Sequence, residues 1–140
     1  MTLIPHILRI IPLAFAAALL LSSCEHADPL EPADLPPTLE SIQANIFNTN
    51  CALSGCHTGG NPPMGLDLSE GNARANLVGV PSQEVPQVFR VKAGNADESY
   101  LVMKIEGAAG IVGQRMPLGR EPLSQEQISL VREWIDGGAN

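Results

Sequence analysis

Hydrophobic residues form one continuous run near the N-terminus and three helix-like patterns further along the chain. The run from Ile10 to Leu21 is too short to cross a membrane, and it has the length of a signal-peptide core. Apolar residues then recur at helical spacing over residues 38–48, 96–106 and 125–136. The pattern predicts a mainly α protein that follows an export signal.

Local signals indicate where these three helices begin. Thr38 follows a proline pair and is the expected N-cap of the first helix. Asn95 or Asp97 is expected to cap the second. Ser124 precedes the third, with Gln127 three positions on, which is a capping-box arrangement. Two weaker patterns predict a helix near 70–77 and a short extended stretch over 85–92.

The apolar run ends in Leu21-Ser22-Ser23-Cys24, which resembles a bacterial lipobox. The resemblance implies a signal peptide over 1–23 and a diacylglyceryl group on Cys24. The protein is then expected in the cell envelope, held by this lipid at a membrane facing the periplasm or the cell exterior. A plain signal peptide with an incidental cysteine is the alternative.

Residues 24–37 are rich in proline and acidic side chains, with no lysine or arginine. Such a composition cannot bury a core and favours extended conformations. We therefore expect a tether over 24–37 and one small domain over 38–140.

The chain is acidic, with 8 Lys and Arg against 15 Asp and Glu and a formal net charge of −7. Removal of residues 1–23 takes away Arg9 and no acidic residue, so the mature chain is more negative still. This balance gives no electrostatic reason to bind nucleic acid. Basic redox proteins are possible partners, although an acidic surface is also simply a soluble one.

The segment Cys51-Ala52-Leu53-Ser54-Gly55-Cys56-His57 carries the main chemical signal. The usual haem-attachment signature is C-x-x-C-H, in which two thiols bond the porphyrin and the histidine ligates iron. Here the spacer is longer, but the second cysteine still directly precedes histidine. The motif predicts one covalent haem c on Cys51 and Cys56, with His57 as an axial ligand.

Other interpretations of these cysteines remain. An exported pair can form a disulfide, and the alternative hypothesis is a haem-free binding or structural module bridged by Cys51–Cys56. Such a bridge closes a short loop and leaves His57 unexplained. A zinc site lacks a nearby fourth ligand. No serine-histidine-aspartate, phosphate-loop or paired-carboxylate pattern indicates an enzyme.

A second axial ligand has three methionine candidates. Met64 lies in a proline-flanked loop close to His57. Met103 falls within a predicted helix, where a methionine is more often a core residue than an iron ligand. Met116 lies in the loop before the last helix, stiffened by Pro117, and is the preferred candidate.

The order of helix, cysteine-histidine motif, glycine- and proline-rich loop, middle helix, Arg115-Met116-Pro117 and closing helix resembles a monohaem class I cytochrome c. The resemblance is closer to small bacterial cytochrome c-like domains, often on lipoproteins. It covers about residues 39–140 and implies electron transfer with unidentified redox partner proteins, without enzyme activity.

This family resemblance also implies the fold and several contacts. The N- and C-terminal helices are expected to cross around the haem, with Phe47 and Trp134 packed near the crossing. The carbonyl of Pro62 or Pro63 is expected to accept a hydrogen bond from the haem histidine. Arg115 is a candidate contact for a haem propionate, and Arg90 and Lys92 are weaker candidates.

Overall fold

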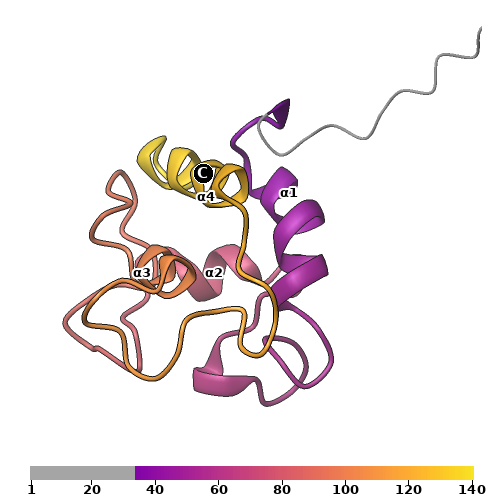
Figure 1. The fold of residues 1–140 in the computed structure, drawn as a ribbon, viewed down its shortest axis with the longest axis vertical. Coiled ribbons are helices and arrows are strands. Elements are labelled where there is room, and N and C mark those ends of the chain that lie inside the picture. Colours follow the sequence, from indigo (N-terminus) through magenta and orange to yellow (C-terminus); the bar gives the residue numbers. More distant parts are fainter. Residues whose placement is uncertain (1–33) are drawn as a thin grey trace, which may run out of the picture.

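The structure, a computed structural model, describes residues 34–140 as a set of short helices joined by long loops (Figure 1). In chain order the elements are α1 (Leu39–Ile42), η2 (Gln43–Cys51), η3 (Pro63–Gly65), α2 (Ala73–Leu77), α3 (Tyr100–Glu106) and α4 (Gln125–Asp136). The mainly α class is therefore confirmed for this part of the chain. The proposed signal peptide and Cys24 lie outside the described residues. Between residues 34 and 140, no helix has the length and apolar character needed to cross a membrane.

The N-terminal helix begins where its cap was predicted. The Thr38 hydroxyl accepts a hydrogen bond from the Ser41 amide at 3.2 Å, and α1 follows. After Ile42 the backbone continues as a π-helix, η2, which ends at Cys51. Nine residues is long for this helix type, which usually occurs as single turns near functional sites. Cys51 is therefore the last residue of the continuous helix, and the loop that contains His57 follows it directly.

The C-terminal helix α4 is the best-specified element. Ser124 and Gln127 form the predicted reciprocal capping box, and the helix ends at Gly137. Its apolar stripe is buried: Ile128, Leu130, Val131, Trp134, Ile135. The helix packs against α1 and α3, and Phe47 and Trp134 both belong to the buried core.

The middle helix starts later than predicted. Residues 96–99 form turns, and α3 begins at Tyr100 with Ser99 in the N-cap position. The Asn95 side chain accepts a hydrogen bond from the Glu98 amide and so caps this turn instead of the helix. The Ala96 amide donates to the Asp136 carboxylate at 2.7 Å, which ties the turn to the end of α4. The hydrogen bond to α4 therefore holds residues 96–99 as a turn, where the pattern predicted the first turn of the helix.

The region between η3 and α3 is mostly loop. The weak helical pattern near 70–77 forms only the short α2. The stretch over 85–92 forms no strand in the described structure; Val91 makes one isolated bridge with Val78, and Phe89 makes another with Pro81. These bridges bring the chain back beside α2 and set Arg90 between them.

The folded part extends slightly beyond the predicted domain boundary. Leu35, near the end of the expected tether, is half-buried and packs against the core. The Thr38 amide also donates to the Pro36 carbonyl at 2.8 Å. The last residues before α1 are therefore held against the domain.

Candidate functional site

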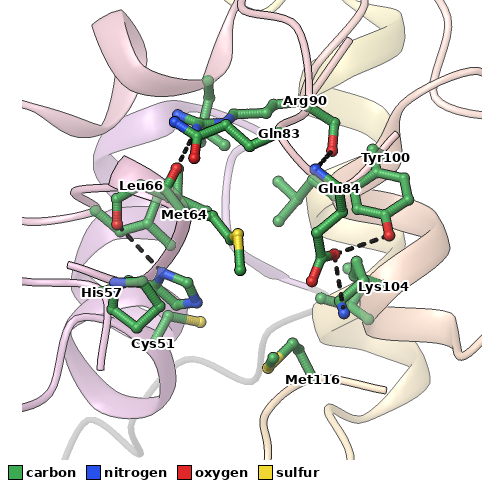
Figure 2. Close-up of a pocket in the computed structure, with 16 residues that line it drawn as sticks. Cys51, His57, Met64, Leu66, Gln83, Glu84, Arg90, Tyr100, Lys104 and Met116 are labelled. Atoms are coloured by element: carbon green, nitrogen blue, oxygen red, sulfur yellow. Dashed lines mark hydrogen bonds and ion pairs between the residues drawn. The ribbon is translucent and has the colours of Figure 1, made fainter. Parts of the chain in front are cut away.

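One pocket brings together most of the residues that the sequence singled out (Figure 2). It encloses about 900 Å³ of empty space, including the part open to solvent. Its walls are largely apolar: Pro63, Leu66, Leu68, Leu77, Leu101, Ile105. Cys51, His57, Met64 and Met116 also line it.

The cysteine loop closes tightly before it reaches His57. The Cys56 amide donates to the Leu53 carbonyl at 2.9 Å, and the His57 amide donates back to the Cys51 carbonyl at 3.0 Å. Gly55, with φ +79°, supplies the left-handed residue within this loop. The longer spacer is thus folded as a compact turn between the two cysteines.

The two cysteines have different surroundings. Cys51 is half-buried and lines the pocket, whereas Cys56 is exposed and is not among the residues that line it, and both are free thiols. Burial, reinforced by the nearby Cys56, raises the pKa of Cys51 to about 12. The Cys51 thiol therefore stays protonated at neutral pH, as a small apolar group facing the pocket.

His57 is oriented by the loop that follows it. Its Nδ1 lies 3.1 Å from the Leu66 carbonyl oxygen, and because a carbonyl only accepts, this bond places the proton on Nδ1. The neutral ring then has its lone pair on Nε2, on the edge that faces the pocket (Figure 2). Burial lowers the pKa of His57, which favours this neutral, ligating form.

The expected acceptor for His57 was wrong. The carbonyl belongs to Leu66 and not to Pro62 or Pro63. The reason is that the two prolines lead into η3, where the Pro62 and Pro63 carbonyls accept hydrogen bonds from Gly65 and Leu66. The loop then turns back, and the first carbonyl to return to the histidine is that of Leu66.

Buried Gln43 supports this loop from the N-terminal helix. Its Nε2 donates to the Leu68 carbonyl at 2.8 Å and to the Asn48 Oδ1 at 2.7 Å. The Leu68 amide in turn donates to the His57 carbonyl at 2.8 Å. The helix, the loop and the histidine are therefore joined through a continuous set of hydrogen bonds.

The structure separates the three methionine candidates. Met116 is half-buried and lines the pocket, with its amide donating to the Lys104 carbonyl at 2.9 Å. Met64 also lines the pocket, but it is 51% exposed. Met103 does not line this pocket and lies in a separate surface depression with Phe89. Two methionines, Met64 and Met116, thus share the pocket with His57.

A polar cluster that the sequence did not indicate forms part of the pocket wall. Lys104 Nζ lies 3.2 Å from the Glu84 carboxylate and donates to the Val112 carbonyl at 2.8 Å. The Tyr100 hydroxyl donates to Glu84 at 2.8 Å and accepts from the Val112 amide at 3.0 Å. Figure 2 shows Glu84 between Tyr100 and Lys104. Through Val112 the cluster joins α3 to the loop that leads to Met116.

A sequence signal for this cluster existed. Tyr100 and Lys104 are four residues apart and therefore share a helical face. Both are buried in the structure. A lysine on the same face of a short apolar helix as its buried residues is a candidate for a buried charge that is paired or hydrogen-bonded.

The candidate propionate contacts lie in different places. Arg90 is buried and lines the pocket. Arg115 is exposed, is not among the lining residues, and lays its side chain against Gly107. Lys92 pairs with Glu98 at the surface. Of the three, Arg90 is the one that the structure brings to the site.

Within residues 34–140 no group of three or more His, Cys, Asp or Glu is placed to hold a metal ion. The donors in the pocket are instead one imidazole and soft sulfur atoms in an apolar setting. Imidazole and thioether are the axial ligands of haem iron in c-type cytochromes. The donor chemistry of the pocket therefore fits haem.

Comparisons of the chain with protein-family models, with curated proteins and with solved structures found no match.

Proposed function

We propose that this protein is an electron-transfer protein that carries one covalent haem c, held to a bacterial membrane by a lipid on Cys24. The observation that carries the proposal is that Cys51, His57 and Met116 line the same apolar pocket. These residues come from a helix end, a loop and a distant second loop, and the fold brings them together. The proposal includes a class I cytochrome c-like fold, for which the contact of α1 with α4 is supporting evidence.

Each residue has a role in this proposal. Cys51 and Cys56 bond the porphyrin through thioethers, and His57 offers Nε2 to the iron. Met116 supplies the second axial sulfur, since it is less exposed than Met64 and is tied to α3 through its own amide. Arg90 replaces Arg115 as the preferred partner for a propionate, because it lines the pocket.

When bound, haem supplies a one-electron couple between ferric and ferrous iron. The protein contributes the ligands, an apolar environment and the exclusion of water. Ligation by histidine and methionine raises the reduction potential relative to other axial pairs. If His57 and Met116 both held the iron, no position would remain open for a substrate, and electron transfer is therefore the proposed activity.

The test is expression of the exported chain in a host with cytochrome c maturation. We expect a red protein that keeps its haem through denaturing electrophoresis. Cys56→Ala should lose most of the covalent haem, because it removes one of the two proposed thioether attachments. A colourless, folded protein with a Cys51–Cys56 disulfide would support the haem-free alternative and end the proposal.

The three methionines provide matched variants for the second ligand. Met116→Ala should abolish the ferric charge-transfer band of a methionine–iron bond and lower the potential. Met103→Ala, outside the pocket, should leave both unchanged. If Met64→Ala has the effect expected of Met116→Ala, the axial ligand is Met64 and the Met116 assignment is incorrect.

A further inference from the structure

We propose that Arg90 is a positioning residue for the axial histidine. Its guanidinium holds the turn at residues 64–66, and the Leu66 carbonyl at the end of that turn orients His57. This inference rests on the proposed function, since it assigns the residue that sets the geometry of the proposed iron ligand.

Arg90 is a buried charge without an acidic partner in the described structure. It is 6% exposed, and none of the ion pairs among residues 34–140 includes it. Its guanidinium instead donates to three backbone carbonyls, those of Met64, Gly65 and Asn76, at 2.5, 3.4 and 2.9 Å. A buried charge is tolerated only when hydrogen bonds replace its hydration. The three carbonyls therefore stabilise the buried guanidinium, and the guanidinium in turn fixes the position of these carbonyls.

The backbone of Arg90 is also fixed. Its amide donates to the Val80 carbonyl at 2.7 Å, and its own carbonyl accepts from the Leu101 amide at 2.9 Å. The residue thus connects the segment beside α2 to the first turn of α3. From this fixed position the side chain reaches across to the histidine loop (Figure 2).

The turn that Arg90 holds includes a residue in an unfavourable conformation. Met64 has φ +54° and ψ +23°, a left-handed region that residues other than glycine, asparagine and aspartate seldom adopt. Such a conformation persists only when surrounding contacts determine it. The shortest of the Arg90 hydrogen bonds goes to the carbonyl of this same residue.

The held turn leads directly to the histidine. Leu66 follows Gly65, its amide donates to the Pro63 carbonyl at 3.1 Å, and its carbonyl lies 3.1 Å from His57 Nδ1. Movement of the turn therefore moves the acceptor that fixes the imidazole. Hydrogen bonding at Nδ1 orients a ligating histidine and raises its basicity, so the effect extends to the iron.

The experiment compares the wild-type holoprotein with Arg90→Lys. Lysine keeps the positive charge but cannot make the planar fork that reaches several carbonyls. We expect the His57 Nδ1 proton of the ferric protein, followed by NMR, to exchange with solvent about tenfold faster, the factor expected from losing one charge-assisted hydrogen bond. The midpoint potential should rise, because a weaker Nδ1 hydrogen bond makes the imidazole a poorer donor to ferric iron.

The matched control is Arg74→Lys. Arg74 is exposed, and its Nε donates to the Ala139 carbonyl at 3.2 Å and not to a carbonyl of the turn at residues 64–66. Proton exchange at His57 and the potential should both stay at wild-type values in this variant. A merely structural arginine at position 90 would change stability alone, and one that acted only on a propionate would change the potential without speeding proton exchange at His57.

Wild-type exchange and potential in Arg90→Lys holoprotein would overturn the proposal. If Arg90→Lys yields no holoprotein, Met64→Asn decides instead, since asparagine adopts the left-handed conformation readily. Relief of the strain should then slow the exchange of the His57 proton, and an unchanged rate would overturn the proposal. A wild-type protein without covalent haem would instead remove the proposed function, and this inference with it.

Discussion

The two sides of the pocket are held in different ways. On the histidine side, His57, Gln43 and Arg90 donate to backbone carbonyls of residues 64–68. On the methionine side, the loop before Met116 is held through the Glu84–Lys104 ion pair and its contacts with Val112. One side uses a buried network that involves the main chain, and the other depends on a pair of opposite charges.

This difference indicates which ligand is easier to lose. Loss of one hydrogen bond on the histidine side leaves several others in place. On the methionine side, loss of the Glu84 charge leaves Lys104 with a buried positive charge and no acidic partner. We therefore expect changes to the methionine side to have the larger effect on stability and to free Met116 before His57.

The largest expected effect comes from Glu84→Gln. The Lys104 side chain is 10% exposed and that of Glu84 19%, so the pair is largely removed from solvent. Breaking one partner of a buried pair is strongly destabilising, and with this residual exposure we expect a loss of about 2 kcal/mol in the free energy of unfolding. Urea unfolding provides the measurement.

The surface pair of Lys92 and Glu98 supplies the control for that change. Glu98→Gln should have no measurable effect on unfolding, because exposed pairs contribute little. If Glu84→Gln also leaves the free energy of unfolding unchanged, the methionine side of the pocket does not depend on the Glu84–Lys104 ion pair.

A smaller effect is expected from Gln43→Leu on the histidine side. The change removes two side-chain hydrogen bonds and leaves the Leu68 carbonyl without its buried donor. We expect a loss of about 1–2 kcal/mol, measured in the same urea experiment. Gln125→Leu, at the exposed start of α4, should unfold like the wild type. A loss larger than that of Glu84→Gln would reverse the order of the two sides.

The smallest expected effect concerns the cysteines of haem-free protein and leaves the fold unchanged. Cys56 is exposed, whereas burial raises the pKa of Cys51 to about 12. Because the thiolate is the reacting form, iodoacetamide at pH 8 should modify Cys56 at least about tenfold faster than Cys51. Mass spectrometry of timed samples gives both rates.

The same pKa shift predicts a direction for stability with pH. The unfolded Cys51 thiol ionises near pH 9.0, while the folded one stays protonated to about 12. Within this window the folded state binds more protons, so haem-free protein should lose stability as the pH rises from 9 towards 12. Cys51→Ser should reduce this loss. Equal alkylation of both thiols would contradict the burial of Cys51.

The helices were predictable because their signals are local. Ser124 and Gln127 cap α4, and Thr38 caps α1, through side chains a few residues away from the amides that they bind. The order of the motifs predicted one haem site for Cys51, Cys56, His57 and Met116. Of these residues, Cys51, His57 and Met116 line one pocket. The choice of Met116 over Met64 as the second axial ligand remains a prediction.

The parts that sequence did not give depend on distant contacts. The start of α3 is decided by the bond between Ala96 and Asp136, and the orientation of His57 by Leu66. Arg90 resembles any surface arginine in the sequence, and only the fold brings it beside the carbonyls of residues 64, 65 and 76. Such long-range bonds leave no periodic pattern to detect.

The most direct test of the central claim is the intact mass of the mature, denatured polypeptide, purified from a host that attaches haem c. We predict a single added haem that remains after denaturation, with neither Cys51 nor Cys56 available to iodoacetamide. A polypeptide without added haem, in which both cysteines are free or joined to each other, would contradict the account.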